Sequence, residues 1–258
     1  MRNHHCRSLL AALVLGSLTI SGSSPAARSA PAQAEEPSAT AFLAQVRQAF
    51  DDRVWGRLSG RVQHRSPRAR INTDIALSLQ IEAPQLIRAR LVLHGDRVYE
   101  YRRQTANSEA GSACATPRVE FREPTGEAEV TLEELGLRME DLVFDFLYWT
   151  MIEETAAEAV RGRPCRVFLL EDPKSGRRLR AWFAREHLAP LRIVWLEPDG
   201  ESEERLLEMT DFESRRGVWY VKSFILTGDD WQTRVRFFEG SLTAHRHRPP
   251  PDNLFEQP

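Results

Sequence analysis

Residues 139–149 read Met-Glu-Asp-Leu-Val-Phe-Asp-Phe-Leu-Tyr-Trp. Seven of the nine residues from 141 to 149 are apolar or aromatic, and on a helix they cover every side rather than one stripe. A segment without a polar face must be buried. Its length is about half of the ~20 residues that a helix needs to cross a bilayer. The sequence therefore predicts a buried helix, which can be a core helix, a plug or a lid over an apolar site, with Asp141 capping its first turn.

The chain on both sides of this stretch has the patterns of regular structure. Residues 38–50 place Phe42, Val46 and Phe50 four apart, which predicts a first helix with one packing face. From residue 54 onward apolar and polar residues alternate, as in half-buried strands. About four strands are expected before the apolar stretch and about six after it, separated by short turns rich in Gly, Asp and Pro. Such turns join neighbouring antiparallel strands.

The predicted fold class is mainly β (α+β). A sheet of about ten antiparallel strands is expected to be strongly curved, with helices covering its concave face. The helical insert is expected around residues 132–150, with Gly136 as a break, and an extended tail at residues 245–258. Residues 104–117 have no period and are predicted to form a long loop. A curled sheet of this kind has either a filled core or an enclosed ligand.

The chain begins with the pattern of an export signal. Arg2 and Arg7 precede an apolar run at residues 9–20, and Ala32-Gln33-Ala34 provides the small residues that a signal peptidase recognises. Residues 1–34 are therefore predicted to be a cleaved signal peptide, and residues 35–258 a single exported domain. A transmembrane anchor is the alternative, but the run is short and lacks a stop-transfer pattern. Cys6 precedes the run, so no lipid-modified cysteine and no stable membrane anchor are expected.

Charge and motifs argue against several functions. Residues 35–258 carry 32 basic and 37 acidic residues, a net charge of −5, which disfavours non-specific nucleic-acid binding. The sequence contains no Gly-x-Ser-x-Gly, His-Glu-x-x-His, phosphate-loop or Gly-x-Gly-x-x-Gly motif. His245 and His247 can touch one metal ion, but they lie in a basic, proline-rich tail that reads as solvated. We therefore predict no catalytic residue, metal or cofactor, and no enzyme activity.

Cys114 and Cys165 are the two cysteines outside the signal peptide. In an oxidising compartment they can form a disulfide that closes a loop of about 50 residues and contributes about 4 kcal/mol. The alternative is that Cys165 is a small apolar residue in a strand and Cys114 an incidental thiol in a polar loop. The sequence leaves both interpretations open.

Large apolar side chains are distributed over the predicted elements. For any one of them, filling the core of a wide sheet is the simpler explanation. Together with the fully apolar helix, however, they indicate a hydrophobic cavity. The predicted lining residues are Leu142, Val143, Phe144, Phe146, Leu147, Trp149, Trp182, Trp195, Phe224 and Phe237.

This combination resembles the outer-membrane lipoprotein-sorting proteins, the LolA/LolB-like superfamily. The resemblance rests on the export signal, the Phe42-Leu43-x-x-Val46 helix, the apolar stretch and the strands that follow it. The strand motifs are Val160-Arg161-Gly162-Arg163-Pro164-Cys165, Arg180-Ala181-Trp182-Phe183, Pro190-Leu191-Arg192, Asp199-Gly200 and Gly217-Val218-Trp219-Tyr220-Val221-Lys222.

The resemblance implies a periplasmic carrier or chaperone whose half-barrel shields acyl chains, with residues 139–149 as its lid or cavity wall. A 16-carbon chain can contribute up to ~12 kcal/mol, at about 0.8 kcal/mol per methylene, without a specific hydrogen bond. The implied partners are lipoprotein acyl chains or another lipid, with transient contacts to inner- or outer-membrane proteins. The main alternative is a lipoprotein-sensing regulatory module of the same fold; an enzyme or a structural envelope protein is less favoured.

Overall fold

The computed structural model describes residues 36–50, 54–82, 86–94, 97–104, 118–125, 130–244 and 248–256; for 49, 50 and 118–125 it describes the backbone alone. Residues 37–258 form one compact unit. The predicted signal peptide, Cys114, His245 and His247 lie outside the described residues.

Twelve strands form one antiparallel sheet. In chain order they are β1 (Val54–Arg65), β2 (Arg70–Glu82), β3 (Leu86–Leu93), β4 (Arg97–Gln104), β5 (Arg118–Thr125), β6 (Thr150–Val160), β7 (Arg163–Glu171), β8 (Arg178–Ala184), β9 (Pro190–Leu196), β10 (Glu203–Arg215), β11 (Val218–Thr227) and β12 (Gln232–Ala244). The predicted fold class, a mainly β protein with an open antiparallel sheet, is confirmed.

The strand that the sequence patterns miss is β6. It reads Thr-Met-Ile-Glu-Glu-Thr-Ala-Ala-Glu-Ala-Val, and nearly all of its residues are exposed or half-buried. Because β6 is an edge of the sheet, no buried face imposes the alternation by which strands are recognised. Its glutamates and alanines are also poor strand formers.

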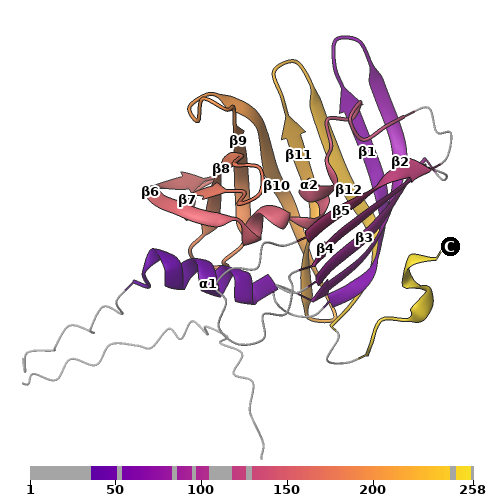
Figure 1. The fold of residues 1–258 in the computed structure, drawn as a ribbon, viewed down its shortest axis with the longest axis horizontal. Coiled ribbons are helices and arrows are strands. Elements are labelled where there is room, and N and C mark those ends of the chain that lie inside the picture. The colour runs from indigo at the N-terminus through magenta and orange to yellow at the C-terminus, as the bar shows by residue number, and fades with distance from the viewer. Residues whose placement is uncertain are drawn as a thin grey trace, which may run out of the picture. The chain divides into compact units, whose positions relative to one another are not determined.

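The strand order β5-β4-β3-β2-β1-β12-β11-β10-β9-β8-β7-β6 places two meanders side by side (Figure 1). β1 pairs with β12 along its whole length and joins the two meanders. β5 and β6 follow each other in the chain, yet they form opposite edges of the sheet. The connection between them must therefore cross the sheet from one edge to the other. Residues 130–149 of this connection are called the insert below.

One face of the sheet, called the inner face, is covered by the insert and by α1 (Ala39–Phe50) (Figure 1). The helix predicted at residues 38–50 is thus present. Phe42 of α1 stacks on Phe168 of β7, with ring centroids 5.8 Å apart. Inward side chains from both meanders join α1 and the insert in a single hydrophobic cluster.

The insert is not the single helix that its composition suggests. It contains α2 (Met139–Val143), then Phe144 in the left-handed conformation with φ 53°, then the 3₁₀ helix η1 (Asp145–Tyr148). The left-handed residue ends α2 as a C-cap does, and the chain changes direction there. The expected burial is confirmed, because seven residues of α2 and η1 are buried: Met139, Asp141, Leu142, Val143, Asp145, Phe146 and Leu147.

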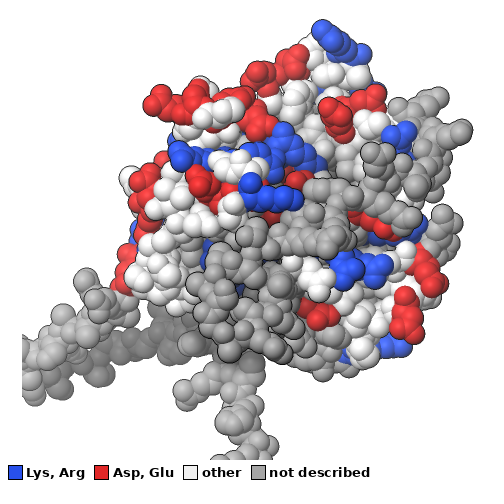
Figure 2. Space-filling model, viewed as in Figure 1, with Lys and Arg blue, Asp and Glu red and all other residues white. Residues whose placement is uncertain are grey.

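The end of the chain packs on the opposite, outer face. Arg57 of β1 donates hydrogen bonds to the carbonyls of Asn253 (2.8 Å) and Leu254 (3.1 Å) in the 3₁₀ helix η2 (Asp252–Phe255). Leu254 is 2% exposed, and the Arg88 guanidinium lies 4.0 Å from the centre of the Phe255 ring. Among the described residues, no helix is long and apolar enough to span a membrane. Acidic and basic side chains are intermixed on the face seen in Figure 2.

Candidate functional site

The inner face gathers nine of the ten predicted lipid-contacting residues. Eight of them belong to its hydrophobic cluster and are at most 6% exposed, and Phe144 packs against them, partly buried. These eight are Leu142, Val143, Phe146, Leu147, Trp149, Trp195, Phe224 and Phe237. Phe146 is central: its ring meets Phe144 edge-on at 5.9 Å and Trp195 of β9 at 6.4 Å. The insert side chains thus occupy the surface that a lipid would contact.

Trp182 is the exception, and grouping it with the others is wrong. It lies in a second cluster on the outer face of β7 to β9, and its indole N–H donates a hydrogen bond to Glu158 at 3.0 Å. Ala181 and Phe183 belong to the inner cluster, so strand geometry directs Trp182 to the other side. The alternation is hidden in the sequence because all three residues are apolar or aromatic.

Cys165 also belongs to the outer cluster. Its side chain is fully buried and forms no disulfide with any residue that the structure describes, and its thiol donates to the Arg163 carbonyl at 3.3 Å. Burial raises the pKa of this thiol above its ordinary value. Because Cys114 lies outside the described residues, the disulfide between them stays a prediction.

Two ion pairs attach the beginning of α2 to β10. Arg205 Nη1 and Nη2 donate to the two oxygens of Asp141, at 2.7 and 2.9 Å, and both side chains are almost fully buried. The Asp141 carboxylate also accepts the Arg138 backbone N–H, at 2.8 Å. Asp141 therefore caps the first turn as expected, from the third helical position. Arg138 in turn binds Glu204.

The rest of the insert is held by side chains that bind its carbonyl groups. Arg47 of α1 donates to the carbonyls of Leu147 (2.8 Å) and Trp149 (2.7 Å), and Thr233 of β12 donates to that of Leu135. The backbone–backbone hydrogen bonds described for residues 132–149 close local turns and do not extend the sheet. The insert can therefore move away without breaking a strand ladder.

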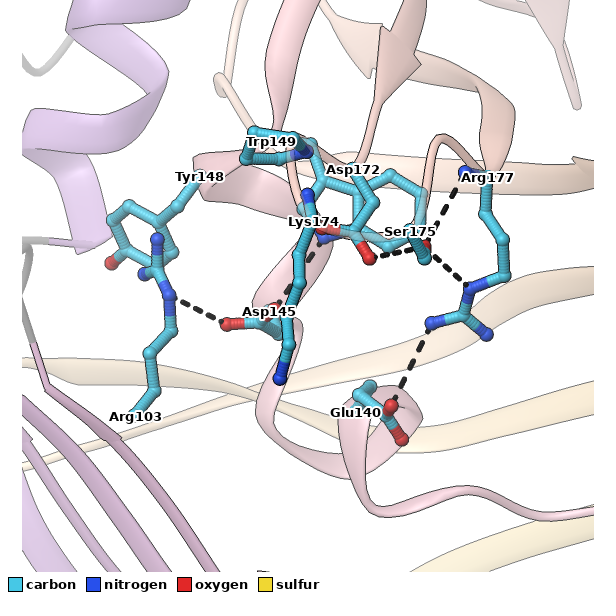
Figure 3. Close-up of a pocket in the computed structure, with 10 residues that line it drawn as sticks. Arg103, Glu140, Asp145, Tyr148, Trp149, Asp172, Lys174, Ser175 and Arg177 are labelled. Atoms are coloured by element: carbon cyan, nitrogen blue, oxygen red, sulfur yellow. Dashed lines mark hydrogen bonds and ion pairs between the residues drawn. The ribbon is translucent and has the colours of Figure 1, made fainter. Parts of the chain in front are cut away.

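A pocket of about 450 Å³, lined largely by residues with charged side chains, opens beside the insert (Figure 3). Arg103 of β4 forms one wall, the insert forms a second, and the turn between β7 and β8 forms a third. Besides Arg103, its lining residues are Glu140, Asp145, Tyr148, Trp149, Asp172, Pro173, Lys174, Ser175 and Arg177. Trp149 belongs to the inner hydrophobic cluster and Tyr148 packs against it, so the pocket adjoins the apolar face.

The charged groups of this pocket are partly desolvated. Arg103 Nε lies 3.1 Å from Asp145 Oδ1, and Trp149 Nε1 donates to Asp145 at 3.4 Å. Burial raises the pKa of Asp145 and of Glu140 above their ordinary values, although Arg103 and Arg177 respectively oppose the shift. Sequence reasoning missed this pocket. The sequence feature that could have indicated the pocket is Asp145, an acidic residue within an otherwise apolar stretch.

No family model matches the chain, and no curated protein matches it. Among solved structures, an outer membrane lipoprotein-sorting protein domain from Vibrio parahaemolyticus is similar, with a TM-score of 0.58, 12% identity, and coverage of 83% of this chain and 94% of that one. A LolA superfamily protein from Nitrosomonas europaea superposes with a TM-score of 0.55, 9% identity, and coverage of 83% and 96%. The chain has the LolA fold.

A DUF1329 family protein from Desulfovibrio piger shares this LolA fold, with a TM-score of 0.56, 13% identity, and coverage of 83% of this chain and 94% of that one. The resemblance expected from the sequence is thus confirmed for the fold. At these identities the likeness concerns the course of the backbone, so function must be argued from the side chains of this chain.

Proposed function

We propose that this protein is a periplasmic carrier that shields the acyl chains of a lipid or lipoprotein on the inner face of its LolA fold. The observation that carries the proposal is the insert. Its apolar side chains cover the concave face, and in the part of the chain that the structure describes only side-chain contacts bind it to the sheet. Two proteins of similar fold, a lipoprotein-sorting domain and a LolA superfamily member, support the proposal.

The energetics favour an exchange between insert and lipid. Each large apolar side chain of the insert contributes about 1.5–3 kcal/mol through burial. An incoming acyl chain contributes about 0.8 kcal/mol per methylene, or up to ~12 kcal/mol for 16 carbons. The burial free energy of the insert's apolar side chains taken together is of the same order as that of an acyl chain. A lipid can therefore replace the insert on the inner face at a modest net cost in free energy. The polar anchors Asp141, Arg205 and Arg47 then set how readily the insert moves.

The export signal read from residues 1–34 supports a periplasmic location, where such a carrier meets lipoproteins between the two membranes. Transient contacts with membrane proteins would load and unload it.

One observation favours a second candidate, a lipoprotein-sensing module. β6 is an edge strand with one unpaired side, and its Ile152 is 47% exposed, which suits a protein partner that adds a strand. Transfer of bound lipid to acceptor vesicles distinguishes the two candidates: a carrier should release its lipid to the vesicles, whereas a sensor should retain it.

Native mass spectrometry of the protein purified from its own periplasm, followed by lipid extraction, tests the proposal. Co-purifying acyl-chain species are expected. A protein that is free of lipid and also fails to take up a fluorescent fatty acid would overturn it.

Variants at the centre of the inner face sharpen this test. Phe146→Glu should abolish loading, whereas Phe146→Leu, which keeps the surface apolar, should retain it. Trp219→Glu is the matched control, because Trp219 is 70% exposed and can accept the same charge without burying it. Circular dichroism and the urea midpoint of each variant show whether the sheet stays folded.

A further inference from the structure

The outer face of the sheet concentrates arginine side chains at its centre, where β2, β1 and β12 lie side by side (Figure 1). In residues 61–65, 70–74 and 232–236, every second residue is exposed, and the residues between them point to the inner face. Asp74 is the one acidic residue among these exposed positions. Five of the positions are arginines, together called the arginine face below: Arg61, Arg65, Arg70, Arg234 and Arg236.

The strand register brings like charges of the arginine face together. Arg61 lies directly opposite Arg236 of β12, and Arg65 lies directly opposite Arg70 of β2. Like charges in directly opposite positions of an antiparallel pair destabilise the sheet. Asp74 binds Arg61 at 3.1 Å, but within the described part of the chain the other four arginines of this face form no ion pair. A negatively charged partner would relieve their repulsion.

The surroundings do not neutralise the arginine face. Residues 35–258 have a net charge of −5, so a cluster of five arginines does not follow from the overall composition. The residues of β11 opposite the two β12 arginines are Ser223 and Ile225, which carry no charge. Asp229 and Asp230 precede this part of β12 in the chain, and Glu239 follows it. These acidic residues border the arginine face and lie outside it.

An exposed aromatic ring lies beside the arginine face. Phe238 is 49% exposed, and the Arg236 guanidinium lies 5.8 Å from the centre of its ring. The preceding Phe237 is buried on the inner face, and the pairing of β1 with β12 shifts register at this point. Such a bulge adds one residue to a strand, which leaves the Phe238 ring at the surface. Aromatic rings next to cations are typical of surfaces that lie at a lipid–water interface.

The layout of these groups favours a membrane over a single ligand or a protein. With about 4.8 Å between strands and about 3.3 Å per residue, the arginine face covers roughly 10 Å by 13 Å. Its cations are spread over this area and surround no apolar centre, which a stable protein interface normally has. A bilayer offers repeated anionic headgroups to the arginines, and acyl chains beneath them to the Phe238 ring.

We propose that the arginine face and Phe238 dock the protein on the surface of a membrane that contains an anionic phospholipid such as phosphatidylglycerol. Each arginine near such a surface strengthens binding by about fivefold. The inference goes beyond the proposed function and does not depend on it, because the proposed site for acyl chains is on the inner face.

Co-sedimentation of the purified mature protein with vesicles tests the inference. The vesicles consist of phosphatidylcholine alone, or of phosphatidylcholine mixed with phosphatidylglycerol. Binding to the anionic vesicles should exceed binding to the neutral ones by at least about tenfold. It should weaken as the salt concentration rises, because salt screens exposed charges. Equal binding to both kinds of vesicle, or no binding at low salt, would overturn the inference and leave an acidic protein as the partner of this face.

Variants of the arginine face test the assigned contacts. Arg236→Gln should weaken binding to the anionic vesicles about fivefold, and Arg234→Gln/Arg236→Gln about 25-fold. Lys174→Gln is the matched control, because it removes one exposed positive charge from the turn between β7 and β8, and it should have no effect. Arg236→Gln also removes the like charge opposite Arg61, so its urea midpoint should not fall. This separates a loss of binding from a loss of folding.

Phe238→Ser should weaken binding about fivefold, because the exposed half of the ring no longer enters the apolar part of the bilayer. Phe238→Trp keeps a large aromatic ring and should bind as wild type does. If Phe238→Ser and the arginine variants all bind like wild type, the assigned face is wrong.

Fatty-acid uptake separates this inference from the carrier proposal. The arginine variants should take up a fluorescent fatty acid normally, and Phe146→Glu should keep its binding to anionic vesicles. If Phe146→Glu abolishes vesicle binding, the protein attaches through an acyl chain on the inner face and the inference is refuted. A wild-type protein that takes up fatty acid but binds no vesicle refutes the inference alone. One that binds vesicles but takes up no fatty acid refutes the carrier proposal alone.

Discussion

Arg205 of β10 and Asp141 of α2 form a two-fold hydrogen-bonded ion pair inside the protein, with side-chain exposures of 4% and 0%. The Arg205 guanidinium also lies 4.0 Å from the centre of the Trp195 ring. This pair connects the polar beginning of the insert to the floor of the apolar inner face. It therefore couples the position of the insert to the second meander.

Removing one partner of this pair should be costly. Asp141→Asn or Arg205→Met leaves a buried charge uncompensated, and each should lower the free energy of unfolding by about 3–5 kcal/mol. The double variant Asp141→Leu/Arg205→Met should cost clearly less than the sum of the two losses. Urea denaturation measures all three. If the losses of the two single variants simply add in the double variant, the two side chains do not stabilise each other. Arg61→Ala, which removes an exposed ion pair with Asp74, is the control and should lower the free energy of unfolding by less than about 1 kcal/mol.

Arg47→Ala tests whether the insert competes with lipid. The change removes two hydrogen bonds to the end of the insert, worth about 1 kcal/mol each. A less firmly held insert uncovers the inner face more often, so a fluorescent fatty acid should bind several-fold to about tenfold more tightly. Gln48→Ala, on the exposed side of the same helix, should leave the affinity unchanged. Weaker binding by Arg47→Ala would mean that the insert contributes to the lipid site instead of covering it.

Glu154 and Arg166 predict a pH dependence of stability. Arg166 donates two hydrogen bonds to Glu154 across β6 and β7, both 2.5 Å, and they hold the pKa of that carboxyl below its ordinary value of 4.5. The pair stabilises the protein fully above pH 4.5 and is lost as pH falls through the lowered folded-state pKa. Glu154→Gln should therefore lower the free energy of unfolding by about 1 kcal/mol at neutral pH, and this difference should shrink in acid.

Urea titrations of wild type and Glu154→Gln at neutral and acidic pH measure that difference. Glu153→Gln, exposed on the same strand, provides the comparison. A difference that does not change with pH would show that the loss comes from packing and not from the carboxylate charge.

Gly136 allows the insert to approach Trp231. It has a φ of +65°, and a Cβ at this position would lie 2.4 Å from the nearest ring carbon of Trp231. Gly136→Ala should therefore cost about 3 kcal/mol, from backbone strain together with overpacking. Gly162→Ala separates the two effects, since Gly162 also has a positive φ but no atom within 4 Å of an added Cβ, and it should cost about 1 kcal/mol. Thermal unfolding of both variants checks the difference, and equal losses would rule out the steric contact.

Local patterns predicted much of the candidate site. The apolar composition of residues 141–149 predicted that this stretch is buried. Nine of the ten proposed lipid contacts lie together on the inner face. Trp182 was misplaced because apolar neighbours conceal which way a strand residue points. The pocket residues Arg103 and Asp145 were missed, because their partnership depends on two elements that only the folded sheet brings together.

The class of the fold, the short antiparallel connections and the burial of the stretch before β6 could all be predicted from the sequence. These properties follow from side-chain period and turn chemistry, which act over a few residues. The pairing of β1 with β12 could not be predicted in this way, nor could the position of β5 and β6 at opposite edges of the sheet. That arrangement makes the insert cross the inner face and brings Asp141 to Arg205, 64 residues away in the chain. Contacts of this separation depend on how the two meanders pack around a common core, and no local pattern encodes that choice.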